Sequence, residues 1–303
     1  MTVFARVARL GGFAAAAREL HISTTSVSRT IGQLEEHLGA RLLRRTTRQV
    51  SLTDAGVVYL ERCERILADV QELEEALGEG QREPRGRLRI SAGVSFAQEQ
   101  LHTVLPAFVE QHPNLECELM LTDRRVDLVR EGVDIAIRIG RLADSTLFAR
   151  RLSPCRHAVC ASPDYTDRHG MIRHPAELAD HACIIDTNQP RGWWFAGPDG
   201  QEATQLAEGR YRVNSAHGAC DAVLAGIGVA YLPTFVAGPR IERGELVVQL
   251  PGYRAAEVHV YAVYPESRYL SAGVRALIER LAEHFGSDPP WDRWRASAGD
   301  TSR

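Results

Sequence analysis

The chain has 303 residues, a formal net charge of −3, 44% hydrophobic residues and 25% charged residues. Its length suits two or three domains, and it contains no apolar run close to the roughly 20 residues that span a bilayer, which excludes a membrane protein. The first residues interleave arginine with apolar side chains and lack the continuous apolar core of a signal peptide, so we expect a cytoplasmic protein.

The charge is divided unevenly along the chain. Residues 1–60 contain eight arginines and four carboxylates, which gives +4, and the remaining residues therefore carry −7. A small basic module joined to a larger acidic one indicates that only the first module meets a polyanion such as DNA.

Six cysteines form no C-x-x-C pair. In a cytoplasmic setting we expect them to be reduced, and most of them to pack in the core. Cys155 and Cys160 are close enough in sequence for a redox or metal site, but neither has a histidine or cysteine partner at a ligand spacing. We therefore expect no metal and no cofactor.

Residues 1–52 are predicted to form an all-α helix-turn-helix followed by a β-hairpin wing. A first helix of apolar residues at helical spacing stops at Gly11 and Gly12, and an alanine-rich second helix follows. After a tight turn, Ser23 is a good N-cap for a third helix. The apolar stripe of that helix is Val27, Ile31, Leu34 and Leu38.

The predicted DNA contacts are polar residues on the outer face of the third helix and in the wing. At 100° per residue this face lies opposite the apolar stripe, and its hydroxyl and guanidinium groups can bond to base edges. In isolation such a face is more often simply solvated, but residues 41–52 then place four arginines and two threonines between β-forming ends. The candidates are Ser23, Thr24, Thr25, Ser28, Arg29, Gln33, Arg44, Arg45, Thr46, Thr47 and Arg48.

Several motifs in register here resemble the signature of LysR-type bacterial transcription regulators: residues 12–20, 26–35, 38–39 and 45–48. The resemblance implies a winged helix-turn-helix that binds double-stranded promoter DNA, a long linker helix, and a C-terminal two-lobed α/β domain similar to periplasmic binding proteins. That domain binds a small-molecule effector. The resemblance further implies a homodimer, and a dimer of dimers, with RNA polymerase as a further candidate partner.

Residues 53–79 are predicted to form one long helix, and the polar residues 80–86, which include Pro84, a hinge. A stripe spaced 4, 3, 4, 3, 4 runs along the helix: Tyr59, Cys63, Ile66, Val70, Leu73 and Leu77. About three heptads make a marginal coiled coil, which pairs two subunits when other contacts help. The alternative is an amphipathic helix that packs on its own domain. In LysR-type proteins this helix joins two subunits.

Residues 87–287 are predicted to form the two-lobed effector domain. Strands and helices alternate over residues 88–139, which predicts a parallel sheet with helices on both faces, and residues 134–140, 160–163 and 226–233 resemble the LysR-type effector domain. We place lobe I at about residues 87–161 and 266–287, lobe II at about 162–265, and crossing strands at 158–161 and 259–263. The tail, residues 288–303, is expected to be flexible.

An effector is expected in the cleft between the lobes, at strand ends and near helix N-termini. Ser95 and Thr122 match the ligand-contacting positions of the family. Arg138 is more often part of a structural salt bridge, and Trp193 suits either stacking on an aromatic effector or a core role. The candidates are Val94, Ser95, Phe96, Thr122, Arg138, Gly140, Asp186, Thr187, Asn188, Trp193, Asn214 and Ser215.

Two other classes of protein fit less well. Gly226 and Gly228 are spaced as in the start of a dinucleotide fingerprint, but Tyr231 holds its sixth position and the glycines precede a strand. The sequence also contains no H-E-x-x-H or G-x-S-x-G motif, so we expect no catalytic residues and no enzyme. A solute-binding protein of a transporter fits the C-terminal half alone and would lack the basic helix-turn-helix.

Overall fold

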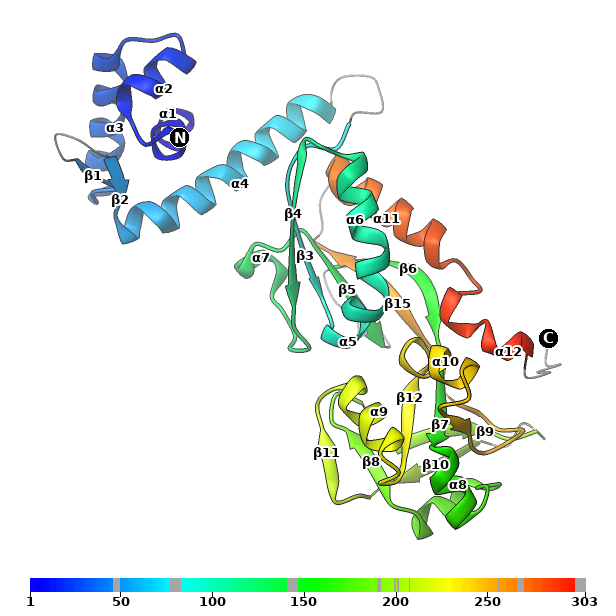
Figure 1. Cartoon of the computed structure of the whole chain (residues 1–303). Coiled ribbons are helices and arrows are strands. Elements are labelled where there is room, and N and C mark those ends of the chain that lie inside the picture. The colour runs from blue at the N-terminus through cyan, green and yellow to red at the C-terminus, as the bar shows by residue number, and fades with distance from the viewer. Residues whose placement is uncertain are drawn as a thin grey trace. The chain divides into compact units, whose positions relative to one another are not determined.

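The computed structural model describes residues 1–45, 50–76, 83–140, 147–189, 192–198, 200, 202–206, 208–255, 257–265 and 270–297, a few of them as backbone only. The chain divides into two compact units, Met1–Gln81 and Arg82–Arg303 (Figure 1). Across the described ranges, no helix combines the length and the apolar character required to traverse a lipid bilayer.

The first unit is a helix-turn-helix with a two-stranded wing and a long following helix. Its elements are α1 (Thr2–Leu10), α2 (Phe13–Glu19), α3 (Thr24–Leu38), β1 (Leu43–Arg45), β2 (Val50–Leu52) and α4 (Asp54–Ala76). The predicted cap is present, because Ser23 Oγ accepts a hydrogen bond from the Ser26 backbone N–H at 3.1 Å. Gly39 ends α3 at φ 61°, a left-handed conformation that favours glycine.

The wing is held against α3 by one carboxylate. Strands β1 and β2 are antiparallel, with Leu43 opposite Leu52. Glu35 on α3 accepts hydrogen bonds from the backbone N–H groups of Leu42 and Leu43, at 2.8 and 3.0 Å. Because Leu42 and Leu43 are also buried in the small core of this unit, the base of the wing is fixed to α3 by both polar and apolar contacts.

Lobe I of the second unit is built on a mixed sheet. Across the sheet the strands are β4 (Leu115–Leu121), β3 (Gly86–Ala92), β5 (Ile135–Gly140), β15 (Val258–Tyr264) and β6 (Phe148–Cys155). Strands β4, β3 and β5 are parallel as predicted, whereas β15 is antiparallel to both β5 and β6. The helices of the lobe are α5 (Val94–Phe96), η1 (Ala97–Leu101), α6 (His102–Gln111), α7 (Leu128–Glu131) and α11 (Ala272–Phe285), and α6 and α11 lie side by side against the sheet (Figure 1).

Lobe II contains a second mixed sheet and a small antiparallel one. The first has the order β11 (Tyr211–Val213), β8 (Cys183–Asp186), β12 (Val229–Pro233), β7 (His157–Ala161), β13 (Val247–Val248), and the second has the order β10 (Glu202–Leu206), β9 (Gly192–Ala196), β14 (Arg254–Ala255). The helices are α8 (Pro163–His169), η2 (Pro175–Asp180), α9 (Ala216–Leu224) and α10 (Thr234–Glu242).

The lobe boundaries differ from those expected. The chain passes from lobe I to lobe II at Arg156, between β6 and β7, and returns between β14 and β15. Residues 157–161 therefore belong to lobe II and residues 258–264 to lobe I, so neither segment is a strand that crosses between lobes. The reason is long-range pairing, because β15 forms ladders with β5 and β6 while β7 pairs with β12 and β13.

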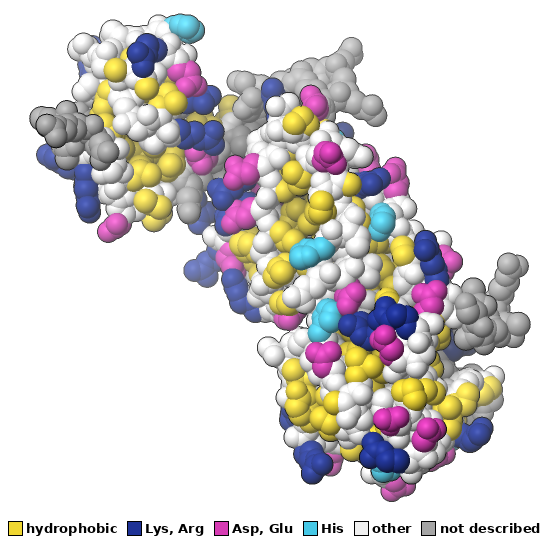
Figure 2. All heavy atoms as spheres, in the orientation of Figure 1, with side chains coloured by type: hydrophobic (Ala, Val, Ile, Leu, Met, Phe, Trp, Pro, Cys, Tyr) yellow, Lys and Arg dark blue, Asp and Glu magenta, His cyan; other side chains and the backbone are white. Residues whose placement is uncertain are grey.

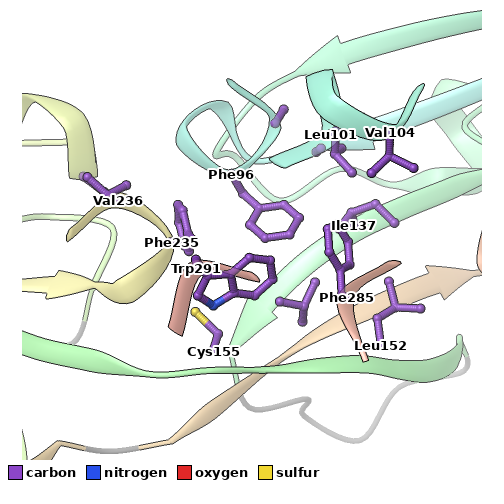
Figure 3. Close-up of a cluster of buried hydrophobic side chains, with 14 of the residues drawn as sticks. Phe96, Leu101, Val104, Ile137, Leu152, Cys155, Phe235, Val236, Phe285 and Trp291 are labelled. Carbon is purple, nitrogen blue, oxygen red and sulfur yellow. The ribbon is translucent and has the colours of Figure 1, made fainter. Parts of the chain in front are cut away.

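The tail is part of the packed structure as far as residue 297. It forms η3 (Pro290–Asp292) and α12 (Trp294–Ser297). Trp291 is 3% exposed, and its ring lies 5.8 Å from Phe96, 6.5 Å from Phe235 and 5.3 Å from Phe285, centroid to centroid (Figure 3). The expectation of a flexible tail is wrong for these residues, because one large aromatic ring fills a slot formed by the end of α11 and by two elements that are far away in the sequence, α5 and α10. Residues 298–303 lie outside the described part of the chain.

A glycine on α10 makes this docking possible. A Cβ at Gly238 would lie 2.1 Å from the backbone oxygen of Trp291, so any larger residue would displace the tail. The aromatic cluster around Trp291 joins both lobes, since Phe96 and Phe285 come from lobe I and Phe235 from lobe II (Figure 3).

Candidate functional site

The outer face of α3 is exposed, as a DNA-reading helix requires. Ser23, Thr24, Thr25, Arg29 and Gln33 are exposed and Ser28 is half-buried. On the opposite side Val27 and Ile31 are fully buried in the core of the first unit. The burial pattern therefore separates a packed side of α3 from a polar side, at the helical period seen in the sequence.

The wing is described only at its base. Arg44 is exposed on β1, and Arg45 is described by its backbone alone. The predicted contacts Thr46, Thr47 and Arg48 lie outside the described residues. The described part therefore places one guanidinium group of the wing, that of Arg44, at the surface of the unit that carries α3.

The predicted heptad stripe of α4 divides into two parts. Cys63 is 1% exposed, and the Tyr59 ring packs edge-on against Phe4 of α1 at 5.3 Å, so these members pack on their own helix-turn-helix. Ile66 and Val70 follow with exposures of 45% and 46%. The Leu73 side chain and the whole of Leu77 are outside the described residues. An intersubunit seam on α4 would therefore begin near Ile66, one heptad later than expected.

In lobe I, the predicted hydroxyls stand at one edge of the sheet. Strands β3 and β4 are in register with Ala92 opposite Leu121, and the Thr122 N–H donates to Ala92 O at 2.9 Å. Ser95 follows β3 and is 8% exposed, while Thr122 is half-buried. Ser95 and Thr122 thus lie just after two neighbouring strands, at the same edge of the sheet, where the Thr122 hydroxyl accepts from the Arg124 N–H at 3.3 Å. Val94 is also half-buried here, and its N–H donates to Asp123 Oδ1 at 3.0 Å.

Arg138 lies at the end of β5 beside this edge. Its Nη2 donates to Ser91 Oγ at 2.8 Å and its Nη1 to Ile137 O at 3.3 Å. Burial lowers the pKa of Arg138, and the nearby Asp123 carboxylate opposes that effect. No salt bridge to Arg138 is found within the described ranges, so its predicted structural ion pair is not observed there. Gly140 ends the strand, half-buried, at φ 143°.

In lobe II, the facing candidates surround the end of β8. Asp186 is half-buried there, and burial raises its pKa, as does the Asp123 carboxylate of lobe I, while the Asn188 N–H that donates to it at 3.0 Å lowers it. Thr187 and Asn188 are exposed. Asn188 Nδ2 donates to Asn214 O at 2.8 Å. The Asp123 carboxylate of lobe I thus raises the pKa of Asp186 in lobe II and that of Arg138 in lobe I.

The remaining lobe II candidates have structural partners. Asn214 is exposed, and Ser215 caps α9 by accepting from the Gly218 N–H at 3.3 Å. Trp193 is 4% exposed and stacks on Tyr231 in the core of lobe II at 5.5 Å. Phe96, from lobe I, is 3% exposed within the aromatic cluster. Their burial favours a packing role for Trp193 and Phe96 over contact with an effector.

A polar cluster that the sequence did not predict joins the lobes. Glu99 on η1 accepts from His217 Nε2 of α9 at 2.7 Å and from Arg240 Nη1 of α10 at 3.4 Å. The hydrogen bond from His217 lowers the pKa of Glu99, burial opposes it, and the charge of Arg240 lowers it further. Figure 2 shows histidine, arginine and acidic side chains gathered where lobe I meets lobe II. No local motif signals this cluster, because its members are far apart in sequence.

The cysteines considered for redox or metal chemistry are buried thiols. Cys155 and Cys160 are inaccessible, and burial raises the pKa of each far above its ordinary value, so both stay protonated and unreactive at neutral pH. Within the described ranges, no three histidine, cysteine or acidic side chains are close enough to hold a metal ion.

Known families account for nearly the whole chain. Residues 1–57 match the model of the bacterial regulatory helix-turn-helix protein of the lysR family, and residues 81–286 match the LysR substrate binding domain. The chain is 35% identical over 286 residues to the HTH-type transcriptional activator AaeR of Escherichia coli, a match that covers 94% of this chain and 93% of that protein. It is 36% identical over 287 residues to the HTH-type transcriptional regulator PtxR of Pseudomonas aeruginosa, covering 94% and 92%.

The fold agrees with these sequence matches. The structure of CrgA, a LysR-type transcriptional regulator from Neisseria meningitidis, is similar with a TM-score of 0.62 and 31% identity, covering 94% of this chain and 98% of that one. Proteins of this family are transcription regulators rather than enzymes; they bind promoter DNA and small-molecule effectors, and they oligomerise. The chain belongs to the LysR family of bacterial transcription regulators.

Proposed function

We propose that this regulator reads promoter DNA with the outer face of α3 while its wing contacts phosphates or the minor groove. One observation carries the proposal. Thr25, Arg29 and Gln33 are exposed at successive helical turns, whereas Val27 and Ile31 on the other side are buried. The proposed DNA-reading surface extends to Ser23, Thr24 and Ser28. The proposed DNA contacts of the wing are Arg44, Arg45, Thr46, Thr47 and Arg48. A regulator with these contacts acts on promoter DNA in the cytoplasm.

The test is selection of bound sequences from a random pool of duplex DNA by the full chain. We expect the pool to converge on two related half-sites, because a dimer presents two copies of α3. Arg45→Ala and Arg48→Ala should weaken binding to specific and random duplexes alike and flatten its dependence on salt. A pool that does not converge would contradict sequence-specific reading by α3. If the DNA affinity of the two wing variants depended on salt as strongly as that of the wild type, the wing would not contact DNA.

The exposed apolar residues of α4 support a homodimer, and we propose that two such dimers pair into a dimer of dimers. Ile66 and Val70 are each nearly half exposed, which is costly for an apolar helix face in water unless a second copy covers it. Sedimentation across a range of protein concentrations distinguishes the dimer from the tetramer. The relative named a transcriptional activator supports the further proposal that the DNA-bound form contacts RNA polymerase.

A small-molecule effector is proposed to bind between the lobes through Ser95 and Thr122. Ser95 and Thr122 lie at one edge of the lobe I sheet. The Asp123 carboxylate, which follows Thr122, raises the pKa of Asp186 in lobe II. A ligand that bridges these groups shifts the balance between lobe arrangements. Val94, Arg138 and Gly140 from lobe I and Thr187, Asn188, Asn214 and Ser215 from lobe II complete the proposed surroundings.

A thermal-shift screen of small carboxylates and aromatics is the test for an effector, because a compound that binds the folded protein raises its melting temperature. Effector and operator must then change each other's affinity by the same factor, since the coupling is reciprocal. The double variant Ser95→Ala, Thr122→Ala should lose effector affinity while its melting transition and operator binding remain. Unchanged effector affinity in that variant would show that these hydroxyls are not the site.

A further inference from the structure

A cavity of about 530 Å³ lies in lobe II, next to the two connections between the lobes. Strands β7, β9, β13 and β14 line it together with helix α12 of the tail. Neither Ser95 nor Thr122 belongs to its lining. Its volume falls within the roughly 300–1,000 Å³ of small-molecule sites. The cavity is therefore large enough for a ligand and separate from the proposed effector cleft.

The lining is rich in flat aromatic surface. Trp194 comes from β9, Trp294 from α12, and Tyr253 precedes β14. Among the described residues, Trp294 Nε1 is buried without a hydrogen-bond partner, which is unusual because an unsatisfied buried donor costs free energy. Because that nitrogen is inaccessible, the wall offers a ligand its aromatic surface alone, which suits a planar ring.

The charge of the lining selects an anion. Three arginines and a single carboxylate, that of Glu257, line the cavity. Arg156 is already neutralised, with Nη1 at 2.6 Å from Asp292 Oδ2 and Nε at 3.2 Å from Glu257 Oε2. Arg254 is exposed and forms no ion pair with any residue that the structure describes. A guanidinium group at the edge of an aromatic cavity favours a carboxylate, which it binds through two parallel hydrogen bonds.

We propose that this cavity is a second ligand site that binds a small aromatic carboxylate, with its ring on the aromatic wall and its carboxylate on Arg254. At this location a ligand touches both connections between the lobes. Arg156 stands at one lobe connection, pairs with Glu257 beside the other, and pairs with Asp292 of the tail. The ligand contacts all three segments at once and thereby changes the relative stability of the lobe arrangements.

The test is calorimetric titration of the full chain with benzoate as the anionic probe and benzylamine as a cationic probe with the same ring. Benzoate should bind and benzylamine should not. Arg254→Gln should weaken benzoate binding by roughly tenfold or more, because a charge-assisted contact is lost. The matched control Arg212→Gln, an exposed arginine on β11 away from the cavity, should bind benzoate as the wild type does.

Any of the following results would overturn the second site: no benzoate binding, equal binding of benzylamine, unchanged benzoate affinity in Arg254→Gln, or equal loss in Arg212→Gln. The double variant Ser95→Ala, Thr122→Ala locates the probe. Unchanged benzoate affinity supports the second site, and lost affinity would place benzoate in the cleft between the lobes instead. DNA binding by Arg254→Gln in the absence of benzoate should equal that of the wild type, so failure of this site leaves the proposed DNA-reading surface untouched.

Discussion

Replacement of Trp291 by alanine should destabilise the effector domain strongly. The indole is 3% exposed and packs against Phe96, Phe235 and Phe285, so its removal leaves a cavity lined by three rings from both lobes. Truncation of a buried tryptophan to alanine costs about 3–5 kcal/mol. For a unit of this size each kcal/mol lowers the melting temperature by about 2–4 °C, so the expected loss is roughly 6–20 °C.

Differential scanning calorimetry of the full chain is the assay, because its signal does not depend on tryptophan. Tryptophan fluorescence is unsuitable, since the substitution removes one of four tryptophans. The matched control is Arg293→Ala, an exposed residue two positions along the same tail, which should change stability by less than about 0.5 kcal/mol. A loss below about 1 kcal/mol for Trp291→Ala would refute the packed tail and, with it, the link between the lobes through the aromatic cluster.

Three further predictions concern DNA reading, assembly and the polar contact between the lobes. Arg29→Ala should weaken specific binding by about 1–3 kcal/mol and relax base preference at one position of each half-site; equal losses on specific and random duplexes in anisotropy titrations would make it a phosphate contact. Val70→Asp combined with Leu73→Asp should break the dimer, because charge would be buried in an apolar seam, and sedimentation that still shows a dimer would assign the assembly to the effector domains. Glu99→Gln should destabilise the effector domain by about 1 kcal/mol at neutral pH. Because the pKa of folded Glu99 is lowered from 4.5, its contribution is present above that value and is lost as the pH falls below it. A destabilisation by Glu99→Gln that is equal at neutral pH and well below pH 4.5 would show that the ion pair is not its cause.

The helix-turn-helix was predictable from the sequence because local signals decide it. Ser23 caps α3, Gly39 ends it, and Val27 and Ile31 are buried at the spacing that the apolar pattern indicates. Each signal acts within one or two helical turns, so no distant part of the chain is needed to interpret it. The same holds for β1 and β2, which are neighbours in sequence.

Tertiary structure decided whether an aromatic residue packs in the core or faces a ligand. Phe96 and Trp193 follow or lie within strands in the manner of ligand contacts, yet each is at most 4% exposed because other aromatic rings cover it. The tail was misjudged for the same reason. Its composition indicates disorder, but the Trp291 ring packs against Phe96, Phe235 and Phe285.

Long-range pairing decided the lobe boundaries and the contacts between lobes. Strand β15 joins lobe I only because its backbone pairs with β5 and β6, more than 100 residues earlier. The polar cluster forms only because the two lobes pack against each other. This packing brings Glu99 of lobe I to His217 and Arg240 of lobe II. The sequence by itself determined the local elements, the basic module and the family motifs, since periodicity, caps and motif spacing act over short distances. Only the tertiary structure decided which surfaces are covered, because burial depends on contacts between segments that the sequence keeps far apart.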